Sequence, residues 1–415
     1  MAFLLQIGGQ ILGIMASALQ NYFFWLLVIL VGFQYRRIAK TRENLFGVRI
    51  GSVYKDTLAA IGHGLIGGFA GSYLLILTGV TIENIGIQYI WPLALMLMLI
   101  NPRFLCFSYA GGIIAVASLL LGNPAGINIP QLMALVAVLH MVESILILMG
   151  GHAGATPMFT KDRSGNIVGG FTLQKFWPIP IAALVIASGQ QIPGPESINM
   201  PDWWPLIKTG VNAGQEMAYA ILPVPVIAAL GYGDLAVART PQEKSRISAR
   251  NLSLYSISLL ALAVLAARWH AFAWAAALFA PLGHELIIYI SRNMEDRGKP
   301  VFIPPVQGVM VLEAVPGSPA VAAGIRSGDV IHTINGYQVN SKKCMEDILA
   351  YHPPLLEVEY VSRRTGRWQR AIMRPRSFQP LGIIFVPEGS EDVYVEMKNV
   401  SLLKRFWDKM FKKAN

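Results

Sequence analysis

The chain has 415 residues, of which 54% are hydrophobic and 14% charged, and its mean hydropathy is +0.48. This composition is too apolar for an ordinary soluble protein. A net charge of +10 would suit a nucleic-acid-binding protein, but here the basic residues flank apolar runs, which is typical of cytoplasmic loops in membrane proteins. Two cysteines, Cys106 and Cys344, are too few for a disulfide framework and fit a cytoplasmic globular part.

Nine apolar stretches before residue 290 are candidate membrane spans, since a span needs about 20 mostly apolar residues. They are 15–34, 57–79, 84–100, 104–122, 129–150, 177–190, 214–232, 251–268 and 270–290. The sixth and seventh are short or rich in proline, so eight spans is an alternative count. The first 14 residues either extend the first span or lie along the membrane interface. The sequence therefore predicts an α-helical polytopic membrane domain of about 8–9 spans over residues 1–290.

Lysine and arginine gather in the loops 36–55, 151–176 and 239–250, whereas the turns at 80–83 and 123–128 carry almost none. Alternation of the spans from a cytoplasmic first loop places all three basic loops and the C-terminal region in the cytoplasm. The loop 151–176 also predicts two short strands around Ser164-Gly165-Asn166. This hairpin is either a docking surface or a rigid turn packed beneath the spans.

Four ionisable residues in two spans require an explanation, because charge inside a membrane is costly. His140 and Glu143 share one face of the fifth span, and His284 and Glu285 lie near the end of the last span. An intramembrane zinc protease needs histidines at i and i+4 with a glutamate after the first, but Ile288 occupies the second histidine position. The sequence therefore predicts no catalytic residue, no metal ligand and no cofactor, and assigns these side chains to hydrogen bonds between helices.

Two alternatives for the membrane domain stay open. A metal assembled from His63, His140 and His284 is one of them. The other is a proton-coupled transporter that uses buried glutamate and histidine, although no internal repeat of the spans stands out.

The residue pattern changes to strand-like alternation after a polar linker at 291–300. Within 308–339, a strand, a short helix capped by Ser318, a second strand and an Asn335-Gly336 turn follow one another. This order resembles a bacterial PDZ domain. An amphipathic helix at 341–352, two more strands and a final strand after Leu381-Gly382 match the circularly permuted bacterial type. The sequence thus predicts a cytoplasmic α+β PDZ domain over 301–390 and a basic amphipathic tail over 391–415.

The PDZ resemblance implies a peptide-binding groove. In such domains a Leu-Gly-apolar turn presents backbone N–H groups to a peptide carboxylate, and the next strand accepts the peptide as an added strand. The residues expected to form the groove are Leu381, Gly382, Ile383, Ile384, Phe385, Cys344 and Ile348. Alternatively, 381–386 is only the closing strand of the sheet and binds no peptide.

Landmarks along the whole chain resemble the MinJ-type cell-division topological determinants of Gram-positive bacteria. They are Tyr35-Arg36-Arg37, the 164–170 turn, Asp202-Trp203-Trp204-Pro205, Ala213-Gly214-Gln215-Glu216, the PDZ core and the closing strand. The resemblance implies a non-enzymatic scaffold of the cytoplasmic membrane, enriched at septa and poles. Its implied partners are the lipid bilayer, a DivIVA-type polar protein and the MinC–MinD inhibitors of FtsZ assembly.

Other functions remain open at this level. They are a PDZ-regulated protein like the intramembrane proteases, a transporter, and a PDZ scaffold for sporulation or envelope proteolysis. The sequence also leaves open which peptide is bound and whether homo-oligomers form.

Overall fold

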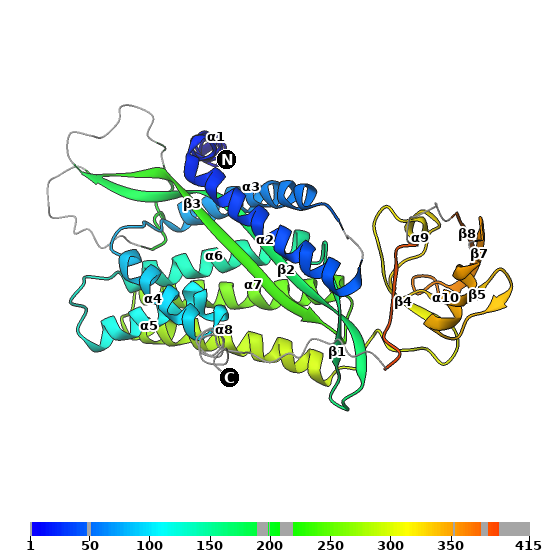
Figure 1. Ribbon diagram of the computed structural model, residues 1–415. Coiled ribbons are helices and arrows are strands. Elements are labelled where there is room, and N and C mark those ends of the chain that lie inside the picture. Colours follow the sequence, from blue (N-terminus) through cyan, green and yellow to red (C-terminus); the bar gives the residue numbers. More distant parts are fainter. Residues whose placement is uncertain are drawn as a thin grey trace, which may run out of the picture.

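The computed structural model describes residues 2–47, 51–188, 198, 200–207, 219–351, 353–374 and 381–389. A large helical domain with a long three-stranded sheet comes first, and a smaller α+β domain lies at one end of it (Figure 1). The tail predicted over 391–415 and the landmark at 213–216 lie outside the described residues.

Eight α-helices in the described residues build the large domain. They are α1 (Ala2–Gln20), α2 (Tyr22–Phe46), α3 (Val53–Thr78), α4 (Ile87–Ile100), α5 (Phe107–Leu120), α6 (Ile129–Gly150), α7 (Pro241–Ala266) and α8 (Ala271–Arg297). Six of them, all except α4 and α5, are long and apolar enough to cross a membrane. Helix α2 exposes large apolar side chains such as Phe23, Ile29 and Phe33. A helix face of this kind suits contact with lipid.

The first predicted span, 15–34, is wrong as a single helix. The chain breaks at Asn21, between α1 and α2. The Asn21 side chain accepts a hydrogen bond from the Phe23 backbone N–H at 2.9 Å and so caps the start of α2. Asparagine favours this position because its side chain satisfies an N–H group that the helix leaves unpaired.

Helices α4 and α5, predicted as spans, are short and are joined by the 3-10 helix η1 (Pro102–Leu105). Each has 14 residues. Such a helix rises about 21 Å, whereas the hydrocarbon core of a bilayer is about 30 Å thick. The turn between them lies beside the middle of α6 and α8, where Cys106 contacts His140 and His284. Helices α4 and α5 therefore enter the helical domain, and the chain between them turns back beside the middle of α6 and α8.

The predicted spans 177–190 and 214–232 are wrong as helices in their described parts, because residues 177–188 lie in β2 and residues 219–232 lie in β3. Strands β1 (Thr156–Lys161), β2 (Ile167–Ser188) and β3 (Tyr219–Ala236) form an antiparallel sheet in the order β1-β2-β3. Prolines two residues apart, as in Pro178 and Pro180, disrupt a helix but can sit side by side on one edge of a strand. The β2–β3 ribbon runs diagonally across the helices (Figure 1).

The outer edge of β2 beyond β1 faces helices and turns, and its backbone groups have partners there. Pro178 and Pro180 carry no N–H at this edge. Other edge groups are paired as follows: Ala182 N donates to Ser72 Oγ (2.8 Å), Ile82 N to Leu184 O (2.9 Å) and Ile186 N to Glu83 Oε2 (2.7 Å). Inside a membrane a strand edge is tolerated only when protein groups satisfy it in this way.

Two glycines of α3 let β2 approach closely. A Cβ at Gly64 would lie 2.0 Å from the Pro178 carbonyl oxygen, and one at Gly68 would lie 2.1 Å from that of Pro180. Any side chain at either position would therefore collide with the backbone of β2.

The segment predicted as a linker, 291–300, is helical as far as Arg297, because α8 continues beyond the predicted end of the last span. Its polar residues lie on the final turns of this helix. The smaller domain then begins with strand β4.

The smaller domain contains a six-stranded sheet and two short helices. Its elements are β4 (Val309–Ala314), α9 (Pro319–Ala322), β5 (Val330–Ile334), β6 (Tyr337–Gln338), α10 (Lys342–Ala350), β7 (Leu356–Val361), β8 (Trp368–Met373) and β9 (Ile383–Phe385). The sheet order is β8-β7-β5-β4-β9, and β6 pairs with β5. The succession of strand, short helix, strand and turn over 308–339 is confirmed, as is the helix cap Ser318, and Ser341 caps α10.

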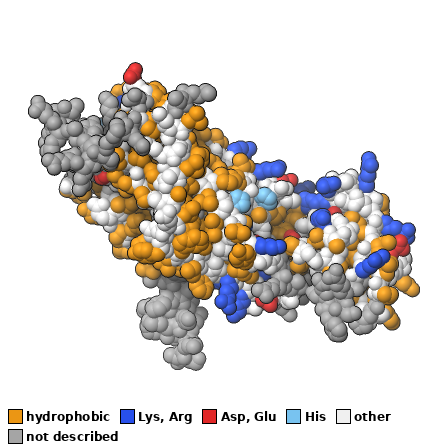
Figure 2. Space-filling view, turned by 90° about the horizontal axis from the view of Figure 1, so that it is seen from above, with side chains coloured by type: hydrophobic (Ala, Val, Ile, Leu, Met, Phe, Trp, Pro, Cys, Tyr) orange, Lys and Arg blue, Asp and Glu red, His pale blue; other side chains and the backbone are white. Residues whose placement is uncertain are grey.

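The predicted cytoplasmic hairpin is present as β1 and the start of β2, and it packs against the smaller domain. The Gly169 backbone N–H donates to the Phe302 carbonyl at 2.9 Å, and a Cβ at Gly169 would lie 2.9 Å from Leu312 Cδ1. Lysine and arginine side chains gather on the smaller domain and on the facing end of the helical domain (Figure 2). Hydrophobic side chains cover most of the remaining described surface in that view.

Candidate functional site

Strand β9, which carries the predicted groove residues, lies at one edge of the sheet among the described strands. It pairs on one side with β4, where Ala314 is opposite Ile383 and Val311 is opposite Phe385. Backbone bonds to β4 come from the Gly382 carbonyl (2.7 Å to Val315 N) and the Val386 N–H (3.0 Å to Met310 O). Because strands have a period of two, the backbone groups of Ile383 and Phe385 point to the opposite edge. That edge has the geometry for pairing with an added strand.

Gly382 precedes β9 in a conformation that favours glycine. Its φ is +73°, and a Cβ there would lie 2.2 Å from the Cβ of Ser318. The preceding carbonyl, of Leu381, accepts a hydrogen bond from Ala320 N at 3.3 Å. The Leu-Gly turn is thus held against the start of α9, which fixes how its backbone leads into β9.

The side chains of β9 point in two directions. Ile383 and Phe385 are half-buried and pack, with Leu381, against the core of the smaller domain. Ile384 is 6% exposed and belongs instead to the cluster that contains Phe302 of the domain junction. Of the predicted β9 residues, only Ile383 and Phe385 can therefore line a groove together with α10, because successive side chains of a strand point to opposite faces.

Helix α10 supplies the other predicted groove residues. Ile348 is half-buried against the same core as Ile383 and Phe385. Cys344 lies one turn earlier, and its Sγ donates to the Gln338 carbonyl at 3.5 Å. Ile383, Phe385 and Ile348 are partly exposed and pack against the same core, and apolar residues of this kind suit contact with an apolar peptide side chain.

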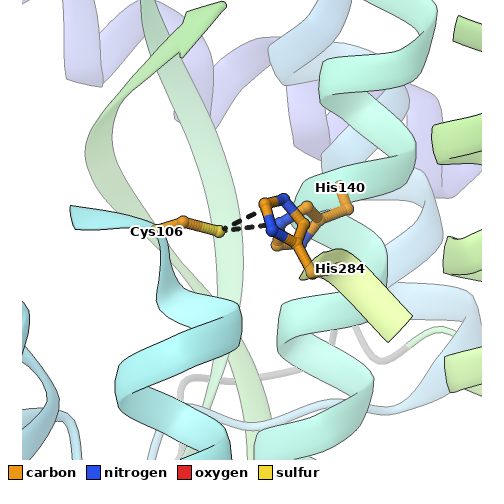
Figure 3. Close-up of side chains that lie close together, drawn as sticks. All are labelled: Cys106, His140 and His284. Atoms are coloured by element: carbon orange, nitrogen blue, oxygen red, sulfur yellow. Dashed lines mark hydrogen bonds between the residues drawn. The ribbon is translucent and has the colours of Figure 1, made fainter. Parts of the chain in front are cut away.

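The intramembrane residues named from the sequence do not form one site. His140 of α6 and His284 of α8 come together beside Cys106 (Figure 3). Glu285 accepts a hydrogen bond from the Tyr109 hydroxyl at 2.7 Å and pairs with Arg103 at 3.1 Å.

Glu143 shares helix α6 with His140 and is half-buried. His63 lies elsewhere, against Gly150, with Nδ1 2.7 Å from the Ala59 carbonyl. Spacing along the sequence did not point to Cys106, because it lies 34 and 178 positions from the two histidines that it contacts.

These features define a protein with a helical, membrane-type domain and a C-terminal α+β domain whose sheet, among the described strands, ends at β9. No protein-family model matches the chain. Over 394 residues, 90% of this chain and 94% of the relative, it is 23% identical to the cell division topological determinant MinJ of Bacillus subtilis. The similarity to MinJ-type proteins that the sequence landmarks predicted is thus confirmed along nearly the whole chain.

A second match is short. The chain is 36% identical over 58 residues to HhoA of Synechocystis sp., a protein classed by its name among the serine proteases. The match covers 14% of this chain and 15% of that protein. It therefore carries no activity over to this chain.

Proposed function

We propose that this protein is a membrane-embedded scaffold that takes part in selecting the site of cell division. The observation that carries the proposal is the similarity to MinJ over 90% of the chain. The helical domain would fix the protein in the cytoplasmic membrane. The smaller domain would recruit partner proteins at septa and poles.

In this proposal the smaller domain has a circularly permuted PDZ fold. Support comes from the edge position of β9, the Leu381-Gly382 turn before it, and the contact of α10 with the segment after β9, where Lys342 N donates to Glu388 Oε1 at 2.6 Å. A partner's C-terminal segment would add as a strand along Ile383 and Phe385 and place an apolar side chain near Ile348. Candidate partners are a DivIVA-type polar protein, a MinD-like protein and proteins associated with FtsZ.

The orientation follows from the basic loops. Helix α2 meets loop 151–155 and the start of β1 through Arg42, whose Nη2 donates to the Gly154 carbonyl and whose Nε donates to Thr156 Oγ1 at 2.7 Å. The end of α8 and the smaller domain lie at this same end of the molecule, where basic side chains gather (Figure 2). By the positive-inside rule, this end would face the cytoplasm.

The scaffold is proposed to act without catalysis. His284-Glu285 has Ile288 where a zinc protease needs its second histidine. The rival functions are a transporter and a scaffold for sporulation or envelope proteolysis.

Complementation of a deletion strain tests the proposed groove. The variant Ile348→Glu puts a charge beside β9, and Ile372→Glu is its matched control, because Ile372 lies on β8 at the other edge of the sheet and is 55% exposed. We expect minicells or filaments in the deletion strain and with Ile348→Glu, and normal division with wild type and Ile372→Glu at equal protein abundance. Normal division with Ile348→Glu would contradict the groove's role.

A further inference from the structure

Three metal-ligating side chains from distant parts of the chain meet inside the helical domain. They are Cys106 just before α5, His140 in the middle of α6 and His284 in α8 (Figure 3). Cys106 Sγ lies 3.0 Å from His140 Nε2 and 3.8 Å from His284 Nε2, and the ligand atoms all lie within 4.8 Å of one another. Tetrahedral zinc, with Zn–S about 2.3 Å and Zn–N about 2.0 Å, places sulfur and nitrogen about 3.5 Å apart. The two sulfur–nitrogen distances therefore lie within about 0.5 Å of the separation that a bound ion imposes.

The second nitrogen of each imidazole is held by a group that can only accept its hydrogen. His140 Nδ1 lies 2.7 Å from the Val136 carbonyl. His284 Nδ1 lies 3.4 Å from the Tyr109 hydroxyl oxygen, whose own hydrogen goes to Glu285 Oε2 at 2.7 Å. In the neutral rings both Nδ1 atoms therefore carry the hydrogen, and both Nε2 atoms present a lone pair toward the Cys106 sulfur. Histidines that bind metals are oriented in this way by their outer hydrogen bonds.

Among the described residues, too few hydrogen-bond donors reach these lone pairs. Tyr255 donates its hydroxyl hydrogen to the Ala280 carbonyl at 2.8 Å, so Ser108 donates to the Tyr255 oxygen at 2.6 Å. Ser108 Oγ, which lies 3.3 Å from His140 Nε2, then has no hydrogen left for that nitrogen. The one Cys106 S–H group remains for two Nε2 atoms. A cation would satisfy both of them and the sulfur together.

We propose that Cys106, His140 and His284 bind a divalent transition-metal ion of the zinc class through Sγ and the two Nε2 atoms. Thiolate and imidazole are the ligands that such ions prefer. Binding would release the thiol proton to solvent and leave a site with one net positive charge. Glu285, which pairs with Arg103 at 3.1 Å, accepts the hydrogen of the Tyr109 hydroxyl that contacts His284 Nδ1, so it belongs to the outer hydrogen bonds of the site.

The ion would join three elements that the sequence separates. His140 is 3% exposed, whereas Cys106 and His284 are half-buried, so the site can be reached from one side. Cys106 belongs to the turn between the short helices α4 and α5, and the histidines belong to α6 and α8. A metal ion there would hold this turn against the middle of α6 and α8. Three protein ligands also leave a fourth position for water or another ligand.

Metal content of the full-length protein tests the proposal directly. The protein is purified in detergent after growth with added Zn²⁺, and its first-row transition metals are measured by mass spectrometry against protein amount. We expect about one ion per chain in wild type and at least a tenfold loss in Cys106→Ser and His284→Gln. His63→Gln is the matched control, because His63 also lies in a helix of this domain but away from the cluster, and it should retain the ion.

Cobalt provides a second readout that a folding defect does not imitate. Loading the metal-free protein with Co²⁺ should give a sulfur-to-cobalt charge-transfer band that Cys106→Ser abolishes and Cys344→Ser leaves unchanged. Tyr109→Phe, which removes the partner of His284 Nδ1, should weaken Co²⁺ binding by roughly 10- to 100-fold and keep the band. Gel filtration reports whether each variant remains folded.

Two results would overturn the proposal. One is a wild-type metal content no higher than that of folded Cys106→Ser. The other is a Co²⁺ spectrum without the sulfur band in a protein whose Cys106 reacts rapidly with thiol reagents. The second result would mean that Cys106 and His140 form a thiolate–imidazolium pair and bind no metal.

Discussion

Glu295, near the end of α8, is a buried carboxylate with several partners. It accepts from the Val237 and Ala238 backbone N–H groups at 2.9 and 2.8 Å, pairs with Arg239 at 2.9 Å and lies 3.5 Å from Lys244 Nζ. Glu295 is 7% exposed and Lys244 is 1% exposed. Loss of the Glu295 carboxylate therefore leaves the buried Lys244 ammonium with less negative charge nearby to balance it.

We expect Glu295→Gln to lower the stability of the protein by about 3–5 kcal/mol, the usual effect of breaking a buried ion pair. Thermal unfolding in detergent measures the change. The neighbouring Asp296→Asn is the control, because Asp296 meets Arg163 at 3.5 Å on the surface, and an exposed pair contributes less than about 1 kcal/mol. Equal effects of the two substitutions would contradict the network.

Glu313 on β4 makes the stability depend on pH. Burial raises the pKa of its carboxyl from 4.5 to about 7, although Arg42 acts in the opposite direction. The folded protein thus holds this proton more tightly than the unfolded chain. Stability should therefore fall as pH rises from about 4.5 to about 7 and then level off.

The variant Glu313→Gln should lose this pH dependence and be more stable than wild type above pH 7 by roughly 1–3 kcal/mol. Thermal unfolding between pH 5 and 8 would show it, with the exposed Glu346→Gln as control. A Glu313→Gln profile parallel to that of wild type would refute the assignment.

At the scale of elements, the contact between α3 and β2 depends on glycine. Gly64→Ala would place its Cβ 2.0 Å from the Pro178 carbonyl oxygen, so helix and strand must separate. Gly62, two residues earlier on α3, has nothing within 4 Å of an added Cβ. We expect Gly62→Ala to stabilise the protein by up to about 1 kcal/mol through helix propensity and Gly64→Ala to destabilise it by several kcal/mol. Thermal unfolding compares them, and a harmless Gly64→Ala would contradict the packing.

The same elements show where the sequence was sufficient and where it was not. Apolar runs of 18 or more residues identified α3, α6, α7 and α8, because length and hydropathy decide such helices. Hydropathy could not distinguish β2 and β3 from membrane-spanning helices, since these strands are also long and apolar. The proline pairs, such as Pro223 and Pro225, were the available signal for strands. The break at Asn21 was missed because one capping residue scarcely changes the mean hydropathy.

The candidate groove could be predicted in part. The Leu381-Gly382 turn is specific because only a few residue types adopt a positive φ. The inward direction of Ile384 was not predicted, since the smaller domain packs on the β1–β2 hairpin and buries that face. Contacts between distant segments, such as Cys106 with His284, leave no spacing signal in a single sequence.

At the scale of the whole molecule, three features suit a scaffold. The helical domain presents apolar surface for lipid, the basic residues gather at one end, and the smaller domain lies at that end with an open sheet edge. The hairpin packs against the smaller domain through Gly169 and Phe302, which limits where a partner can approach. The outer edge of β9, which pairs with no other described strand, is the surface proposed for recruitment.

The most direct test is the position of a full-length fluorescent fusion in dividing cells of the source organism. The scaffold account predicts enrichment at septa and young poles. It also predicts that the deletion strain produces minicells or filaments, which the fusion corrects. An even distribution over the membrane, together with normal division in the deletion strain, would contradict a role in selecting the division site.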